Sequence, residues 1–403
     1  MLKLDLLQTL SLAAVVYFVG IALRQRVAWL ARLNIPAAVI GGLLFTLFTT
    51  IARPFELGVQ LDTSTQTVLM VAFFTSIGMG ASVALLKRGG VPLVVFLVFA
   101  SVFCFVQNFV GIAIALGFGE HPLLGVMAGS VTLVGGPATG QAFAGEFERA
   151  GLAGAGVLAL AAATAGIVCG GLAGGPVGTF LIRRLKRRET LPAKAAPAEL
   201  QRELNPPPTT LLVDVDREDN TILLSLVFLA VAMGVGSLLS AWFVSLGITL
   251  PAYIGAMIVA SVMRNIDDVT GRLKLDVRAM EFAGNVALNI FLVVALMDLK
   301  LWQIADLALP LIVILAAQVL IVVLFALTVS FYLMGRDYDS AVMAGGFIGF
   351  VLGTTANAVA NMQALVLRFG PAPRAFLIVP LVGAFFIDFT NAIIITFFLN
   401  WLR

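Results

Sequence analysis

Long, nearly uncharged runs of apolar residues constrain the fold of this chain more than any other feature of its sequence. A helix needs about 20 such residues to cross the ~30 Å hydrocarbon core of a bilayer. These runs predict an all-α polytopic membrane protein with about ten transmembrane helices. The ten runs are Leu4–Leu23, Ile35–Ile51, Thr67–Leu86, Pro92–Phe118, Ala153–Ile182, Thr221–Leu246, Thr249–Met263, Met280–Met297, Leu307–Met334 and Ala375–Leu402.

The composition excludes several other classes. Only 12% of the residues are charged, about half the fraction usual in soluble domains, and a net charge of +3 is too small to favour a nucleic-acid partner. The single histidine, His121, and two cysteines inside apolar segments offer neither a metal cluster nor a nucleophile with a base. We therefore expect no enzyme and no cofactor.

Two further segments, 123–145 and 341–367, are apolar but rich in Gly, Thr and Asn, which is typical of interrupted helices. The string Val126–Gly129 recurs letter for letter as Val342–Gly345, and other features repeat at nearly the same spacing. The chain thus divides into a first repeat (1–182), a polar linker (183–220) and a second repeat (221–403), with one interrupted segment in each repeat.

The distribution of basic residues predicts the orientation of the spans, because cytoplasmic loops are enriched in Lys and Arg. If both interrupted segments are re-entrant, each repeat has five spans, and 20 of the 25 basic residues fall on one side when both termini lie outside. Spanning segments would give a weaker bias. An odd number of spans per repeat makes the second repeat inverted, as alternating access requires, and places the linker in the cytoplasm.

Each interruption is a candidate substrate site. A broken helix exposes backbone N–H groups at a positive dipole end, which suits a carboxylate. The alternative is that the Gly and Thr residues only permit close helix packing. The substrate-binding candidates are Gly135, Gly136, Pro137, Ala138, Thr139 and Gly140 in the first repeat and Gly353, Thr354, Thr355, Ala356, Asn357, Asn361 and Asp388 in the second.

Asp388 is the most distinctive single residue, because it is an acid in the middle of the last apolar run. A carboxylate there costs several kcal/mol unless it is paired or used. It could hold Na⁺, accept a substrate ammonium, carry a proton, or form a structural pair. Freed carbonyls and neutral side-chain oxygens suit Na⁺, and the candidate Na⁺ ligands are Thr132, Thr355, Asn361, Asp388 and Asn391.

Other polar residues within the runs are weaker candidates. Gln107 and Asn108 interrupt the fourth run, and Gln318 lies in the ninth. Interhelical hydrogen bonds are the more common role for such amides in membrane helices.

The chain resembles the bacterial sodium/glutamate symporter family over nearly its whole length except the linker. The resemblance is carried by the motifs Met70–Gly78 (MVAFFTSIG), Gly129–Gly136 (GSVTLVGG), Ala295–Trp302 (ALMDLKLW), Ala358–Gln363 (AVANMQ), Arg368–Pro371 (RFGP) and Val382–Asp388 (VGAFFID). It implies Na⁺-driven uptake of an acidic amino acid by a homodimer in the bacterial inner membrane. It also implies two inverted five-span repeats and an elevator-type movement.

The chain departs from the family pattern in both interrupted segments. The first usually resembles Gly-Gly-His-Gly-Thr-Gly, and Pro137 and Ala138 stand here in place of His-Gly. The second usually resembles Gly-Ala-Thr-Pro, but reads Gly353–Asn357 (GTTAN), and Phe347 stands where some relatives carry His. These departures leave open a carrier of other small carboxylates, such as citrate-like acids, coupled to Na⁺ or H⁺.

Overall fold

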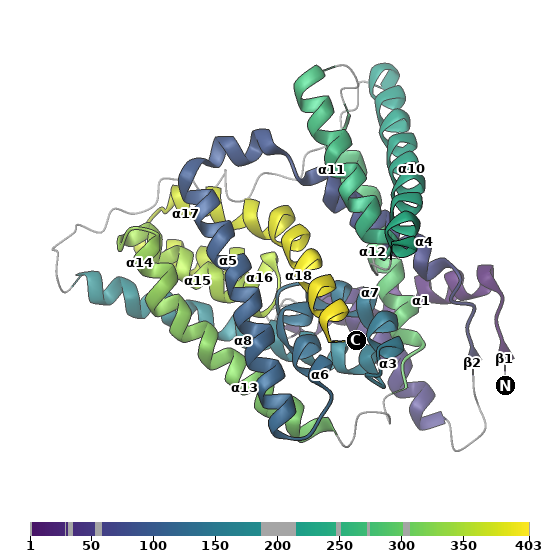
Figure 1. The fold of residues 1–403 in the computed structure, drawn as a ribbon, viewed down its shortest axis with the longest axis horizontal. Coiled ribbons are helices and arrows are strands. Elements are labelled where there is room, and N and C mark those ends of the chain that lie inside the picture. The colour runs from purple at the N-terminus through teal and green to yellow at the C-terminus, as the bar shows by residue number, and fades with distance from the viewer. Residues whose placement is uncertain are drawn as a thin grey trace.

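The computed structural model describes residues 2–28, 30, 35–52, 59–186, 215–246, 251–271, 275–300 and 307–402. Those residues are almost entirely helical (Figure 1). The helices of the first half are α1 (Leu6–Arg26), α3 (Ala37–Ala52), α4 (Thr65–Gly80), α5 (Val83–Gly117), α6 (Pro122–Val126), the π-helical turn η2 (Met127–Val131), α7 (Gly136–Arg149) and α8 (Ala155–Lys186).

The second half repeats this order. Its helices are α10 (Val215–Ser245), α11 (Ala252–Thr270), α12 (Val277–Met297), α13 (Ala308–Phe325), the π-turn η4 (Ala326–Ser330), α14 (Phe331–Leu333), α15 (Tyr338–Leu352), α16 (Thr355–Phe369), α17 (Pro373–Leu381), the π-turn η5 (Val382–Phe386) and α18 (Ile387–Trp401).

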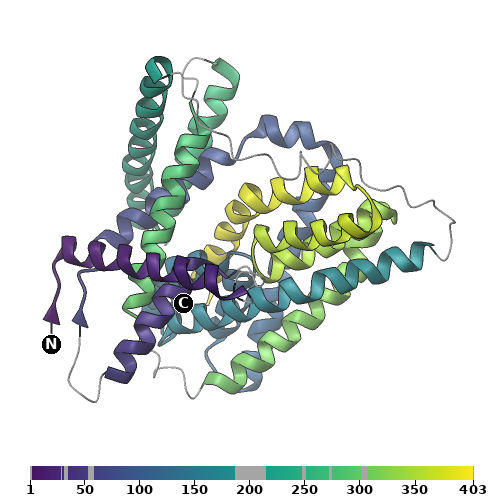
Figure 2. The ribbon, with the colours of Figure 1, turned by 180° about the vertical axis from the view of Figure 1, so that it is seen from behind.

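Two very short strands, β1 (Leu2–Lys3) and β2 (Val59–Gln60), pair in parallel near the N-terminus. The apolar pattern contains no sign of this pairing. The strands lie at the edge of the molecule, away from the interrupted helices (Figure 2).

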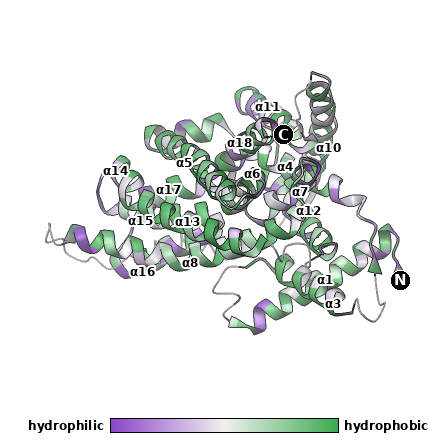
Figure 3. Cartoon of the chain, turned by 60° about the horizontal axis from the view of Figure 1, so that its bottom comes forward, coloured by the Kyte–Doolittle hydropathy of each residue, from purple (hydrophilic) through white to green (hydrophobic). Residues whose placement is uncertain are grey.

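Six of the described helices are long and apolar enough to cross a membrane, so the prediction of a polytopic membrane protein is confirmed. In Figure 3 apolar residues dominate the helices, and the strongly hydrophilic ones gather mostly toward helix ends. The other four predicted spans correspond to shorter or divided helices, namely α3, α4, α11 and the series α17–η5–α18. The count of ten spans therefore stays a prediction.

The predicted linker (183–220) lies mostly outside the described residues. The flanking helices extend into it, because α8 continues to Lys186 and α10 already begins at Val215. The bounds of the linker stay a prediction, since a helix that leaves the apolar core can continue with charged residues on its surface.

The helices pack in two groups. We call α1, α3, α4, α10, α11 and α12 the three-plus-three group, because it takes the first three helices of each half. We call α5–α8 and α13–α18 the broken-helix group. Most helix contacts lie within a group. Between the groups, α4, α11 and α12 contact α5, α7, η5 and α18, and residues of α8 share a buried cluster with residues of α3 and α12. Figures 1 and 2 show α10 and α11 of the three-plus-three group side by side, pointing away from the broken-helix group.

Equivalent glycines let helix backbones touch in both halves of the three-plus-three group. A Cβ at Gly20 in α1 would overlap the backbone of Ala37 in α3, and a Cβ at Gly236 in α10 would overlap that of Ala256 in α11. Small residues at such crossings allow the close van der Waals contact that drives association of helices in lipid.

We predict that Gly236→Ala destabilises the protein by about 1–3 kcal/mol, because the new methyl group has no space against α11. Gly234→Ala is the matched control, since no atom lies within 4 Å of its added Cβ. Removing a helical glycine there should be neutral or stabilising by up to about 1 kcal/mol. The unfolding temperatures of both purified variants can be measured by heating samples and quantifying the remaining folded protein by size-exclusion chromatography. Equal midpoints for the two variants would contradict the packing argument.

Candidate functional site

The first interruption separates η2 from α7. Gly129 has non-helical backbone angles (φ −101°, ψ −129°) inside η2, and Gly136 begins α7 with φ +68°. Only glycine adopts such a positive φ without strain, and Pro137 follows in the first turn, where proline is well tolerated. The Gly-Gly-Pro sequence therefore ends one helix and begins the next.

The second interruption separates α15 from α16. Gly353 leaves the helix with φ −151° and ψ −97°, and Thr354 is the N-cap of α16. The Thr354 hydroxyl accepts a hydrogen bond from the Asn357 backbone N–H at 3.4 Å. Threonine at this position satisfies one of the N–H groups that a new helix leaves free.

The two interruptions meet beside α8. A Cβ at Gly136 would lie 3.6 Å from the Gly353 carbonyl oxygen. A Cβ at Gly166 in α8 would overlap the Leu352 carbonyl and lie 2.6 Å from Leu133 Cδ2. The structure therefore brings the two interrupted segments together, and α7 and α16 both begin where they meet.

The substrate-binding candidates occupy both sides of this meeting point but differ in exposure. In the first segment Ala138 and Thr139 are buried, at 8% and 5% exposure, and Gly140 in α7 packs against Ala159 of α8. In the second segment Thr354 and Thr355 are half-buried and Ala356 is exposed. The second interruption is thus the more accessible of the two.

Polar side chains of α16 bind neighbouring helices. Asn357 donates through Nδ2 to the Ile167 carbonyl at 2.8 Å, and Asn361 donates to the Gly170 carbonyl at 2.9 Å. The Thr355 hydroxyl donates to the Gly383 carbonyl of η5 at 2.6 Å. These bonds use the donors of two candidate Na⁺ ligands, Thr355 and Asn361, to join α16 to α8 and η5. The Asn357 Oδ1 atom is buried without a hydrogen-bond partner.

The other three candidate Na⁺ ligands are Thr132, which directly follows η2, and two residues of α18. The Thr132 hydroxyl donates to the Met127 carbonyl at 2.6 Å, and Asn391 donates through Nδ2 to the Ser130 carbonyl at 2.9 Å. Asp388 is half-buried in the first turn of α18, directly after η5. Asp388 and Asn391 are one turn apart and share a face of that helix.

Five amides are expected from the sequence to be interhelical: Gln107, Asn108, Asn285, Asn289 and Gln318. Three of them do make interhelical hydrogen bonds, whereas Asn289 donates to the Asn285 carbonyl within α12. Asn108 Oδ1 accepts from the Ser130 backbone N–H at 2.9 Å, Gln107 Nε2 donates to the Val351 carbonyl at 3.2 Å, and Gln318 Nε2 donates to the Gln107 carbonyl at 2.7 Å. Gln107 and Asn108 therefore contact both interrupted segments, a role beyond the one predicted. Two adjacent amides in the middle of an apolar run are the signal that indicates it.

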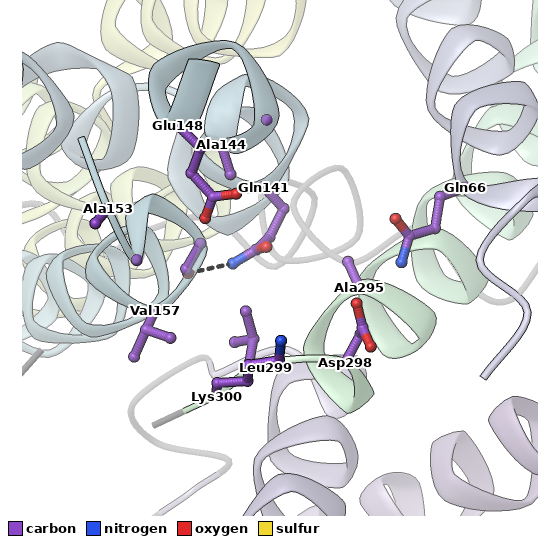
Figure 4. Close-up of a pocket in the computed structure, with 13 residues that line it drawn as sticks. Gln66, Gln141, Ala144, Glu148, Ala153, Val157, Ala295, Asp298, Leu299 and Lys300 are labelled. Atoms are coloured by element: carbon purple, nitrogen blue, oxygen red, sulfur yellow. Dashed lines mark hydrogen bonds between the residues drawn. The ribbon is translucent and has the colours of Figure 1, made fainter. Parts of the chain in front are cut away.

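A cavity of about 470 Å³ lies between the two helix groups, beside α7. Figure 4 shows Gln141 and Glu148 from α7 on one side and Asp298 at the end of α12 on the other. Gln141 Nε2 donates to the Gly156 carbonyl at 2.7 Å. Burial raises the pKa of Asp298 above its ordinary value, and Lys300 partly opposes that shift. The cavity is thus lined in part by α7, the helix that begins at the first interruption.

A polytopic membrane protein in which two interrupted helices meet among buried amides and hydroxyls has the architecture of a secondary transporter. The chain matches the sodium/glutamate symporter family over residues 2–371. It is 39% identical to the sodium/glutamate symporter of Haemophilus influenzae over 387 residues, which cover 96% of this chain and 95% of that protein. It is 38% identical to that of Escherichia coli over 404 residues, 99% of this chain and 98% of that protein.

The chain therefore belongs to the sodium/glutamate symporter family. The resemblance seen in the motifs is confirmed, and so is the expectation that the chain is a transporter and not an enzyme.

We predict that Gly136→Ala lowers the transport rate at least several-fold, because a Cβ at φ +68° strains the start of α7 by roughly 1 kcal/mol or more. Gly145→Ala in the same helix is the control, since nothing lies within 4 Å of its added Cβ. Initial uptake rates, normalised to folded protein, measure the effect. Equal rates in both variants would show that the backbone at the interruption is not critical.

Proposed function

We propose that this chain imports glutamate together with Na⁺ across the bacterial inner membrane by alternating access. The observation that carries the proposal is the meeting of the two interrupted helices beside α8. Such a site offers helix N-termini to a substrate carboxylate, while neutral oxygens nearby suit Na⁺. The membership of the chain in a family of sodium/glutamate symporters supports both the substrate and the ion.

In the proposed topology the two repeats (1–182 and 221–403) are inverted, with five spans each, re-entrant segments at 123–145 and 341–367, and both termini outside. The basic-residue bias supports this orientation. The helix contacts support the internal symmetry, because α3 packs on α12 as α11 packs on α4. In each pair the third helix of one half contacts the second helix of the other.

In the proposed site the N-termini of α7 and α16 bind the two carboxylates of glutamate. The first would use residues 135–140, and the second residues 353–357. Pro137 lacks a backbone N–H, so the first segment offers one donor fewer than a His-Gly pair at that point would. The exposed position of Ala356 and the half-buried Thr354 and Thr355 support access of a substrate to the second segment. Asn361 and Asp388 would face the ammonium group or Na⁺.

The proposed movement is of the elevator type, in which the broken-helix group moves against the three-plus-three group within a homodimer. The sparse contacts between the groups support a sliding boundary, and the cavity beside α7 lies at that boundary. Bound Na⁺ would neutralise Asp388 and so lower the cost of carrying its charge through the membrane.

The uptake of labelled L-glutamate into proteoliposomes, with and without an inward Na⁺ gradient, tests the function. We expect accumulation above equilibrium only with the gradient. Equilibration of glutamate across the membrane that does not depend on Na⁺ would contradict a symporter. Competition by unlabelled citrate and other di- and tricarboxylates tests the alternative substrate class, and stronger inhibition by citrate than by glutamate would favour that class.

Asp388→Asn should reduce gradient-driven uptake at least tenfold and remove its Na⁺ dependence, because an amide leaves no charge for Na⁺ to neutralise. Asp276→Asn is the control, since Asp276 only caps α12 and asparagine caps helices equally well. Uptake assays over a range of Na⁺ concentrations measure both variants. Wild-type uptake with unchanged Na⁺ dependence in Asp388→Asn would overturn the assignment.

A further inference from the structure

Ser130, in the π-turn η2, has a peptide group that is held from two sides. Its N–H donates to Asn108 Oδ1 of α5, and its carbonyl accepts from Asn391 Nδ2 of α18, each at 2.9 Å. The non-helical angles of Gly129 interrupt the helix just before Ser130, and Asn108 supplies a partner for its N–H. The carbonyl also accepts from the backbone N–H groups of Val134 and Gly135, at 3.3 and 3.2 Å, so Asn391 adds a third donor to it. Side chains from two other helices thus fix the position of Ser130.

The same three residues have polar atoms without partners. Ser130 Oγ, Asn391 Oδ1 and Asn108 Nδ2 are buried and make no hydrogen bond, and the three residues are 0–1% exposed. A buried polar group without a partner is costly, so such groups together indicate a ligand. Two of the three atoms, Ser130 Oγ and Asn391 Oδ1, are oxygens that can accept a cation.

Asp388 lies on the face of α18 that carries Asn391, whose Nδ2 atom donates to the Ser130 carbonyl. It lies one turn before Asn391 and close enough to Cys104 of α5 to interact electrostatically with it, and Asn108 follows Cys104 by one turn. Ser101 and Thr390 are hydrogen-bonded at 3.0 Å and join the two helices at this level. Among the described residues the Asp388 carboxylate has neither a hydrogen bond nor an ion pair.

We infer that Ser130 Oγ, Asn391 Oδ1 and the Asp388 carboxylate form a Na⁺ site behind the first interruption. A hydroxyl, an amide oxygen and a carboxylate are the hard oxygen donors that such a cation takes. Asn108 is not among the proposed ligands, because its Oδ1 atom accepts the Ser130 N–H and so holds η2 in place. It is a positioning residue for Ser130.

This inference rests on the proposed Na⁺ coupling and makes it specific. The ion would bind on the α5–α18 side of η2, while the substrate binds where the two interruptions meet. Thr355 and Asn361 would be outside this site, because their hydrogen bonds place them against Gly383 of η5 and Gly170 of α8 and not against Ser130. Through the hydrogen bond from Asn391 to the Ser130 carbonyl, an ion bound by Asn391 would also stabilise the position of the first interrupted segment.

Ser130→Ala is the sharpest test, because the deleted hydroxyl makes no hydrogen bond within the protein. Its removal should leave the thermal stability in K⁺ unchanged or raise it. The Na⁺-induced rise in unfolding temperature, measured without glutamate, should shift to about tenfold higher Na⁺ concentration, as expected for one lost bond to an ion. Asn391→Ala should weaken the binding of Na⁺ at least as much as Ser130→Ala does.

Ser330→Ala is the matched control. Ser330 also lies in a π-turn, is 0% exposed and has a buried Oγ without a partner, but it lies on η4. We expect its Na⁺ response to equal that of the wild type. Equal weakening in Ser130→Ala and Ser330→Ala, or an unchanged Na⁺ response in Ser130→Ala, would overturn the site.

Transport distinguishes this inference from the proposed function. In proteoliposomes Ser130→Ala should raise the half-saturating Na⁺ concentration for uptake about tenfold and leave the glutamate KM at saturating Na⁺ unchanged. A change in glutamate KM alone would assign the cluster to the substrate and contradict the Na⁺ site. If the wild type does not transport glutamate but still shows a Ser130-dependent stabilisation by Na⁺, the site stands and the proposed function fails.

Discussion

The need to satisfy backbone hydrogen-bonding groups inside a membrane governs the structure around both interruptions. Each broken helix frees N–H and carbonyl groups that hydrocarbon cannot hydrogen-bond. At the first interruption Asn108 binds the Ser130 N–H, and Asn391 donates to the Ser130 carbonyl alongside the backbone N–H groups of Val134 and Gly135. At the second, Thr354 caps the new helix and Asn357 and Asn361 attach it to α8.

The two interruptions meet this need in different ways. Amides from other helices, α5 and α18, hold the first. The second carries its own amides, which donate to carbonyls of α8 along a face rich in glycine. A Cβ at Gly174 would overlap Asn361, so α8 accommodates this amide only because it lacks side chains there. The two halves therefore resemble each other more in their backbone than in the polar side chains at their interruptions.

Much of this fold could be predicted from the sequence, because long apolar runs and Gly-rich interruptions are local signals. The membrane class and the residues at which both helices break follow from such signals. The partners of the polar side chains could not be predicted in the same way. Asn391 and Ser130 are 261 residues apart, and only packing brings them together. Thr355 and Asn361 have oxygens suited to Na⁺, but nothing local indicates that neighbouring carbonyls take their hydrogens.

The same constraint connects ion binding to movement in the proposed mechanism. The Ser130 peptide keeps its bonds to both side-chain amides only while α5 and α18 stay in register. An ion that binds Asn391 and Ser130 would stabilise this register, and it would neutralise Asp388 on the adjoining turn of α18. Substrate at the meeting point would stabilise the same segment from its other side. Ion and substrate would then favour one arrangement of the broken-helix group together, which is the thermodynamic requirement for coupling two ligands.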